Sequence, residues 1–394
     1  MKSTDSHLKT VVSDMDFQGS YKDEYGVVYS KDGSKLLYAQ SFGRKPSKKR
    51  YLIKPGTKII CDRAFSCWPT SIEIPDSVTH IGNHAFDCCS KVNFDLPESI
   101  IYIGDGAFET CVFLNGNFVI PSTVSEIAGN PLPSCIESVE CRSPHFKVVN
   151  NCLYSQDMKL LIAVIKDVEK TITLPNTVVK IGDSAFKGTK KLETVIIPDS
   201  VLQIGNNAFE GNYLKELIIP PSVNQIGENI FGVSCPKTLI CESPHFVLED
   251  KTLYTKDKTK IIFCRNSHDS SFLIPDTVTH IESFSFYYSS IKQITIPESV
   301  THIGNHAFEG SSVKELVIPK SVQHIGRAAF CQCDFLSKFS LQKSIAEIDW
   351  EIVCERPSEF AFFACPSLNE IHIPDISDEV FSKLRIESPN ITRC

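Results

Sequence analysis

The chain repeats a short alternation of apolar and polar positions that ends at a proline. In one clear copy, Leu192, Val195 and Ile197 carry the apolar positions and Pro198 follows directly. Apolar residues at alternate positions indicate a strand with one buried face. Proline ends the pairing because it has no N–H to donate to a sheet. The pattern therefore predicts a short strand directly before each such proline.

A second apolar pattern follows each proline and completes a repeat. It reads Val-x-x-Ile-Gly-x-x-Ala-Phe, and neighbouring copies place their prolines 22 to 24 residues apart. One unit of this size buries too little apolar surface to be stable alone, whereas stacked units share a continuous core. The sequence therefore predicts a solenoid of stacked coils. Its clearest copies are Ile74–Phe86, Leu174–Phe186, Ile197–Phe209, Ile296–Phe308 and Ile318–Phe330.

A period of 100 residues is superimposed on the short repeat, since Ser143–Phe146 recurs as Ser243–Phe246. Gly26–Tyr38, Asn151–Ile165 and Lys251–Phe263 also resemble one another, each with two apolar runs around a polar turn, as in a β-hairpin. We therefore expect three blocks of repeats in an elongated stack, each preceded by a hairpin insert that bulges from it. The predicted domains are a polar N-terminal segment 1–20, a solenoid 21–375 with blocks 21–146, 147–246 and 247–375, and a C-terminal cap 376–394.

The unit Ile-Pro-x-Ser-Val-x-x-Ile-Gly-x-x-Ala-Phe-x-x-Cys/Gly resembles the BspA-like, Treponema-type class of leucine-rich repeats. The resemblance covers about residues 25 to 375, and the hairpin segments resemble those interspersed in that family. It implies a β-rich α/β leucine-rich-repeat solenoid, a curved right-handed stack of coils with interspersed β-hairpin inserts. It also implies a chain without a catalytic centre or cofactor, with a role in adhesion to host matrix proteins or in other protein–protein contact.

The charge balance and the apolar runs exclude several partners. The net charge is −7, whereas a nucleic-acid-binding surface needs clustered Lys and Arg. The longest aliphatic run, Leu160–Ile165, is too short to span a bilayer. Met1–Ser20 lacks the apolar segment of a secretory signal, so we expect a cytoplasmic location, with the cell surface suggested by the family alone. The basic run Arg44–Arg50 is interpreted as a solvated loop, with a phosphate, membrane or import contact as the alternative.

The 16 cysteines are interpreted mainly as free structural thiols. Cys88, Cys89 and Cys111 follow a marker phenylalanine by two or three residues, where other copies carry Gly188 or Gly211. This exchange indicates a small residue at a tight, buried turn, since cysteine packs as a small apolar side chain. Disulfides between neighbouring coils and a zinc site are the alternatives, although the chain has no Cys-x-x-Cys pair.

Histidines recur in one column of the repeat, at His80, His280, His302 and His324. His280, His302 and His324 would lie side by side in three successive coils. Because another copy carries Lys180 in this column, we expect an exposed polar ladder. Metal capture together with His306 and a pH-sensitive surface are the alternatives.

Residues two and four positions before each marker proline face away from the core, because side chains alternate along a strand. Stacking turns these positions into two parallel columns, which we expect on the concave face of the solenoid. One column carries several aliphatic residues, and exposed apolar patches mark interaction surfaces. The predicted protein-binding residues are Ile196, Ile218, Leu273 and Val317, with Thr194, Glu216 and Glu315 beside them.

The predicted function is a non-enzymatic repeat scaffold that binds a protein through this face. The alternative is a structural or assembly rod, because β-branched residues are favoured in strands even without a ligand. A cysteine-dependent enzyme, with His84 as a base beside Cys88 or Cys89, is the third function class. No cofactor, metal or nucleic acid is predicted, and the identity of the partner and the oligomeric state are left open.

Overall fold

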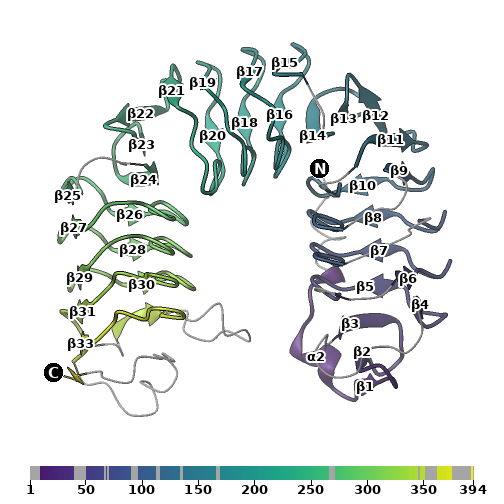
Figure 1. Cartoon of the computed structure of the whole chain (residues 1–394), viewed down its shortest axis with the longest axis horizontal. Helices are drawn as coiled ribbons and strands as arrows, with labels where there is room; N and C mark the ends of the chain where they lie inside the picture. Colours follow the sequence, from purple (N-terminus) through teal and green to yellow (C-terminus); the bar gives the residue numbers. More distant parts are fainter. Residues whose placement is uncertain are drawn as a thin grey trace. The chain divides into compact units, whose positions relative to one another are not determined.

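Two compact units make up the chain in the computed structural model (Figure 1). The first comprises Met1–Lys215 and Gln225–Ser234, and the second comprises Glu216–Asn224 and Cys235–Cys394. The structure describes residues 9–39, 50–65, 68, 71–89, 96–111, 116–133, 136–165, 169–265, 271–344, 347–350, 362–374 and 392–393. Residues 1–8 of the N-terminal segment, residues 44–49 of the basic run, and residues 376–391 and 394 of the C-terminal segment lie outside these ranges. The predicted block boundaries stay a prediction.

Short parallel strands form the rungs of the first unit. Neighbouring coils pair in register, as where Ile81 lies opposite Ile103. The elements of this unit are α2 (Asp14–Phe17), β1 (Tyr21–Lys22), β2 (Val27–Tyr29), β3 (Lys35–Ala39), β4 (Arg50–Leu52), β5 (Ile59–Ile60), β6 (Ser71–Glu73), β7 (His80–Ile81), β8 (Tyr102–Ile103), β9 (Asn117–Ile120), β10 (Glu126–Ile127), β11 (Ser138–Cys141), β12 (Phe146–Val149), β13 (Cys152–Ser155), β14 (Leu160–Val164), β15 (Thr171–Thr173), β16 (Lys180–Ile181), β17 (Thr194–Ile196), β18 (Gln203–Ile204) and β20 (Gln225–Ile226).

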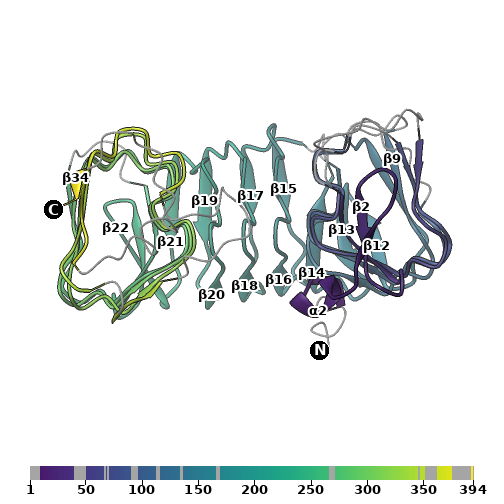
Figure 2. The same cartoon turned by 90° about the horizontal axis from the view of Figure 1, so that it is seen from below.

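The second unit is built in the same way. One of its sheets has the order β22-β23-β24-β26-β28-β30-β32 and another the order β25-β27-β29-β31-β33-β34. Figure 2 looks along several coils of each unit, and within each unit their backbone traces superimpose. The strands are β19 (Glu216–Ile219), β21 (Thr238–Cys241), β22 (Phe246–Glu249), β23 (Thr252–Thr255), β24 (Lys260–Cys264), β25 (Ser271–Leu273), β26 (His280–Ile281), β27 (Gln293–Thr295), β28 (His302–Ile303), β29 (Glu315–Ile318), β30 (His324–Ile325), β31 (Lys338–Leu341), β32 (Asp349–Trp350), β33 (Glu370–His372) and β34 (Thr392–Arg393).

The structure corrects the α/β part of the predicted fold class. The longest helix in the described ranges is α2, of 4 residues, and the coils are built of strands and turns. The segment around Ala185 and Phe186 shows the reason: Ser184 has φ +56° and Gly188 has φ +73°. A right-handed helix cannot pass through left-handed residues placed so closely. The Ala-Phe segment therefore forms consecutive turns, and the fold is a β-solenoid.

The segments expected as hairpin inserts are continuous with the sheets. In the first unit β12 pairs antiparallel with β13, and β13 pairs antiparallel with β14. Asn150 and Asn151 join β12 to β13 with φ values of +48° and +58°, which suits the two-residue turns of hairpins. β14 then pairs parallel with β16, so that it is itself a rung of the stack. This differs from the expected bulge, because the free edge of β14 supplies the hydrogen-bonding groups that the next coil needs.

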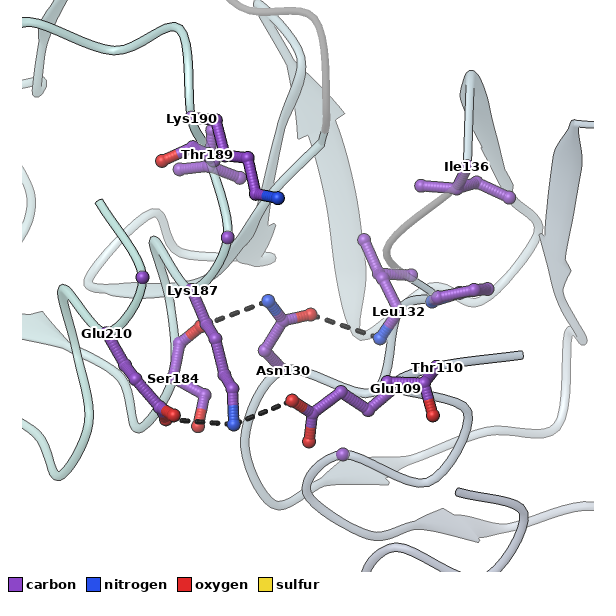
Figure 3. A pocket seen from close by; sticks show the side chains of 15 residues that line it. Glu109, Thr110, Asn130, Leu132, Ile136, Ser184, Lys187, Thr189, Lys190 and Glu210 are labelled. Carbon is purple, nitrogen blue, oxygen red and sulfur yellow. Dashed lines mark hydrogen bonds and ion pairs between the residues drawn. The ribbon is translucent and has the colours of Figure 1, made fainter. Parts of the chain in front are cut away.

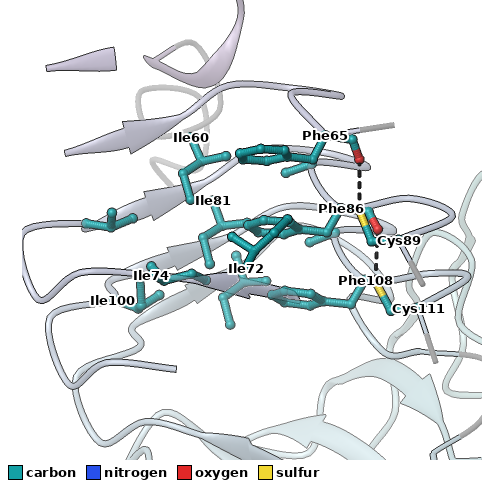
Figure 4. Close-up of a cluster of buried hydrophobic side chains, with 14 of the residues drawn as sticks. Ile60, Phe65, Ile72, Ile74, Ile81, Phe86, Cys89, Ile100, Phe108 and Cys111 are labelled. Carbon is teal, nitrogen blue, oxygen red and sulfur yellow. Dashed lines mark hydrogen bonds between the residues drawn. The ribbon is translucent and has the colours of Figure 1, made fainter. Parts of the chain in front are cut away.

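Stacked aromatic rings fill the centre of each unit. Phe65, Phe86 and Phe108 stack with ring centroids 5.5 and 5.4 Å apart and interplanar angles of 5°, and all three are fully buried (Figure 4). In the second unit Phe286 and Phe308 stack at 5.0 Å. Parallel rings one coil apart keep neighbouring coils in register, because a shift by one residue would turn the phenylalanine out of the core.

A column of small hydrogen-bond donors runs beside the phenylalanines. Cys89 donates to the carbonyl of Phe65 (3.3 Å), and Cys111 donates to that of Phe86 (2.9 Å), as Figure 4 shows. Both cysteines lie three residues after a marker phenylalanine. Asn212, Cys333 and Cys365 donate in the same way to the carbonyls of Phe186, Phe308 and Phe330, and other described members of the column are Thr189, Ser289 and Ser311. The column therefore carries side chains able to donate a hydrogen bond, and in several coils the donor satisfies a buried carbonyl.

Candidate functional site

The strands before the marker prolines alternate between buried and exposed side chains. In β17, Val195 is buried while Ile196 is 50% exposed, and in β29, Leu316 is buried while Val317 is 46% exposed. Leu273, in β25, is 73% exposed. The structure therefore places the aliphatic side chains of the predicted site in solvent, as the alternation required. Their role in binding, and the concave placement of this face, stay predictions.

Within the second unit the face contains an apolar pair that the sequence analysis missed. Ile218 of β19 lies directly opposite Ile240 of β21, and they are 37% and 38% exposed. Ile240 escaped notice because the position two residues further on is Glu242, not the marker proline. The pairing register, with Ile219 opposite Cys241, identifies it.

Carboxylates line the same strands. Glu216 lies opposite Thr238, two residues before the apolar pair, and is exposed. Glu315 lies opposite Gln293 on one side and Lys338 on the other. Lys338 is itself paired with Glu370 at 2.6 Å. The outward face of the second unit thus combines aliphatic side chains with acidic groups. In the first unit, β17 has the same arrangement, with the exposed Ile196 two residues after the polar Thr194.

The first unit also contains a cavity of about 150 Å³ that the sequence analysis did not predict (Figure 3). Its floor is an ion-pair cluster, in which Lys187 Nζ lies 2.6 Å from a carboxylate oxygen of Glu109 and 2.8 Å from one of Glu210. Leu132, Pro133, Ile136 and Val164 are among its apolar walls. The lining of the cavity therefore combines apolar side chains with an ion-pair cluster.

One altered coil creates this cavity. Phe108 donates its N–H to Pro131 as Phe86 donates to Ala107, so that Leu132 stands where other coils have the marker phenylalanine. A leucine fills less space than a phenylalanine. The next residue is Pro133, whereas the corresponding residues of the neighbouring coils are the charged Glu109 and Lys187. The sequence contains a sign of this change. Pro131-Leu132-Pro133 stands where the well-formed copies have Ala-Phe-x.

The base of the cavity is electrostatically satisfied by the chain itself. Burial alone would raise the pKa of Glu109, but His84 and Lys187 lower it to about 2. Burial alone would lower the pKa of Lys187, but Glu109 and Glu210 raise it above its ordinary value. Asn130 also connects its own coil to the segment around Ser184, because its side chain donates to the carbonyl of Ser184 (3.0 Å). These partners make the cluster a structural connection rather than a reactive site.

The histidine column exists in the second unit. The rings of His280 and His302 stack at 4.3 Å with an interplanar angle of 6°, and His324 continues the column 5.9 Å further. Burial, followed by the nearby His302, lowers the pKa of His280. His306 lies apart from this column in the repeat, and its ring stacks on Phe284. In the first unit His80 differs from the expected exposed position, because it packs on Tyr102 and is buried.

No disulfide joins the cysteines of the described ranges. Burial raises the pKa of Cys61 to about 12 and that of Cys152 to about 11, which leaves little thiolate at neutral pH. His84, the base considered for a cysteine enzyme, lies 3.3 Å from Glu109, while Cys89 donates to a backbone carbonyl. Cys67 and Cys135 are outside the described residues.

Two further features are absent from the described ranges. No group of three or more histidine, cysteine or acidic side chains is arranged to hold a metal ion there. No helix among those residues is long and apolar enough to cross a membrane.

Comparison with protein families gives a match to the BspA type leucine rich repeat region, in 6 copies, over residues 36–160, 167–269 and 259–384. A search of curated proteins found no match. Several solved structures are similar at low identity. A leucine rich cell surface protein from Faecalibacterium prausnitzii A2-165 is 22% identical, with 93% of this chain and 97% of that chain covered and a TM-score of 0.42.

A leucine-rich repeat protein from Eubacterium ventriosum is 21% identical, with 73% and 92% of the two chains covered and a TM-score of 0.46. The pneumococcal vaccine antigen PcpA is 20% identical, with 91% and 88% covered and a TM-score of 0.41. The family match extends over most of the sequence and agrees with the resemblance of the repeat unit. The chain therefore belongs to the BspA-type leucine-rich repeat family.

Proposed function

We propose that this chain is a non-catalytic interaction scaffold that binds a protein partner through the outward face of its strands. The observation that carries the proposal is the pair Ile218 and Ile240, which are exposed on adjacent strands and lie directly opposite each other. Leu273 is exposed on the same side of its own strand. Exposed aliphatic surface is unfavourable in water, and a partner that covers it lowers the free energy of the system.

The surrounding charge indicates the chemistry of the partner. Glu216 and Glu315 each lie two residues before an exposed aliphatic residue of the same strand. A complementary surface would carry apolar side chains flanked by Lys or Arg. Adhesion to a host or matrix protein is the finer form of this proposal, and it rests on the family resemblance alone.

Lysine substitution on the face tests the proposal. The double variant Ile218→Lys and Ile240→Lys should fold, because neither side chain faces the core. Leu202→Lys is the matched control, since Leu202 is an exposed aliphatic residue outside this face. Proteins from the native source are retained on immobilised wild-type chain and on both variants and then compared by quantitative mass spectrometry. We expect a protein that the wild type and the control retain and the double variant loses.

Direct titration of that protein should show binding weakened at least tenfold by the double variant. Leu273→Lys provides a second variant whose side chain is too exposed to affect folding. Equal retention by all the chains, or retention of nothing by the wild type, contradicts the proposal. If the wild type instead assembles with itself and the lysine variants do not, sedimentation velocity will show that the face serves a structural assembly.

A further inference from the structure

One coil of the first unit lacks the buried aromatic ring of the repeat, and the cavity lies beside it. Leu132 occupies the place of the marker phenylalanine, since it follows Pro131, the acceptor of the N–H of Phe108. A later coil of the same unit keeps the ring. Phe231 directly follows the acceptor of the corresponding bond from Phe209, is buried, and has its ring 6.2 Å from that of Phe209. The coil of Leu132 is therefore short of one ring.

The cavity has the size of the missing ring. Its volume is about 150 Å³, and its lining surface is mainly apolar. Leu132, Ile136 and Val164 line it, and all three are buried. An engineered apolar cavity of about 150 Å³ is known to bind benzene. The volume and the apolar walls are therefore those of a site for one phenyl group.

Hydrogen bonds and ion pairs hold the walls of the cavity in place. The side chain of Asn130 accepts the N–H of Leu132 (3.0 Å) and donates to the carbonyl of Ser184 (3.0 Å), as Figure 3 shows. Lys187 is held by ion pairs to two carboxylates. How far a cavity collapses depends on how freely its walls can move, and these contacts fix the walls on both sides. The cavity is therefore pre-formed.

The charged residues of the lining favour a neutral aromatic ligand. They are two lysines and two glutamates, Lys187, Lys190, Glu109 and Glu210. Because these charges balance, the cavity has no net charge that would attract an ion. Ammonium groups are attracted to the face of an aromatic ring, whereas an aliphatic group offers them no such interaction. Lys190 is exposed and lies across the cavity from Leu132 (Figure 3), so the cavity opens to the surface on that side.

We propose that this cavity binds a neutral phenyl group, supplied by a small aromatic molecule or by a phenylalanine side chain of a partner protein. The ring lies against Leu132, Ile136 and Val164, where the repeat lacks its own phenylalanine. The site uses no residue of the outward strand face, so it is independent of the proposed function.

Titration of the full chain with toluene, followed by NMR of labelled leucine, isoleucine and valine methyl groups, tests the proposal. We expect toluene to shift the methyl signals of Leu132, Ile136 and Val164 with a Kd below about 1 mM. Methylcyclohexane is similar in size but not aromatic, and it should bind about threefold more weakly or worse. N-acetyl-phenylalaninamide distinguishes the two sources of the ring. If it shifts the same signals, the opening admits a side chain of a partner, and if toluene alone does so, the ligand is a free molecule.

A variant that fills the cavity itself should exclude the ligand. Leu132→Phe supplies the missing ring and should remove the toluene shifts of Ile136 and Val164. Ile136→Phe fills the same space from another wall and takes its place if Leu132→Phe does not fold. Leu202→Phe is the matched control, because it makes the same exchange at an exposed position outside the cavity, and it should leave the Kd unchanged.

Three results would overturn the inference. The first is an absence of methyl shifts in the wild type at saturating toluene. The second is toluene binding by a folded cavity-filling variant that is as tight as that of the wild type. The third is methylcyclohexane binding as tight as toluene binding.

Discussion

Two adjacent residues of the turn after each marker phenylalanine have different requirements. The second residue needs a left-handed backbone, as Gly188 and Gly211 show. The third needs a buried donor, as Cys111 shows. In the sequence alone the two positions look like one preference for small residues, because glycine and cysteine both follow the phenylalanine closely.

The donor column predicts how cysteine can be replaced. Cys111→Ser should keep the free energy of unfolding within about 1 kcal/mol, because serine occupies this column naturally at position 311. Cys111→Val keeps the volume but leaves the carbonyl of Phe86 without its donor, which should cost about 1–3 kcal/mol. Urea unfolding of both variants provides the comparison. Equal stability of the two would show that the column selects size alone.

Thiol reactivity should follow exposure. Cys88 is exposed, whereas burial raises the pKa of Cys61 and of Cys331 to about 12. Iodoacetamide at pH 8 should therefore modify Cys88 before these two, since the thiolate is the reactive form. Peptide mass spectrometry after short exposures measures the order. Modification of Cys61 as fast as Cys88 in the folded chain would contradict it.

At the scale of the coil, the sequence predicted which strand residues are exposed but did not predict the effects of altered copies. The alternation of side chains along the strand correctly predicted that Leu273 is exposed and that Ile274, the next residue, is buried. The cavity beside Leu132 was not predicted. A single altered copy looks like ordinary sequence variation until the positions of the neighbouring coils are known. Ile240 was missed for the related reason that Glu242 replaces the marker proline.

Filling the cavity should stabilise the first unit. Leu132→Phe restores the marker phenylalanine of this coil next to Phe108 and fills apolar cavity surface that Leu132 shares with Ile136 and Val164. We expect the free energy of unfolding to rise by about 1 kcal/mol. Differential scanning calorimetry measures the shift. A lower Tm would mean that the coil is too narrow for the larger ring.

The ion pairs under the cavity should make stability depend on acid. The pKa of Glu109 falls from 4.5 to about 2 on folding, so its stabilising contribution is complete above pH 4.5 and is lost as the pH falls towards 2. The difference in unfolding free energy between the wild type and Glu109→Gln should be about 3 kcal/mol at pH 7 and should shrink over this window. Urea titrations from pH 7 to pH 2.5 test the trend. A difference that does not change with pH would exclude Glu109 as its source.

Across the whole molecule, each coil contacts its neighbours and stability spreads from coil to coil. Phe308→Ala removes a fully buried ring that stacks on Phe286 and Phe330, which should cost about 3–5 kcal/mol. Hydrogen exchange should accelerate most in β28 and in the coils on either side, and less with distance along the second unit. Mass spectrometry of the exchanged peptides measures this gradient. Uniform acceleration across the described coils would indicate a single cooperative unit.

The antiparallel meanders β12-β13-β14 and β22-β23-β24 have the same pairing register, and this has a consequence for how the gene can change. Phe146 pairs with Ser155 as Phe246 pairs with Thr255, and the turns Asn150–Asn151 and Asp250–Lys251 share a left-handed backbone. A recombination that joined residue 150 to residue 251 would delete 100 residues and still bring Phe146 opposite Thr255. Such an unequal crossover would produce a shorter chain with every pairing of the meander intact. The coding sequence can therefore lose a whole block in one step while the hydrogen-bonding register at the junction is kept.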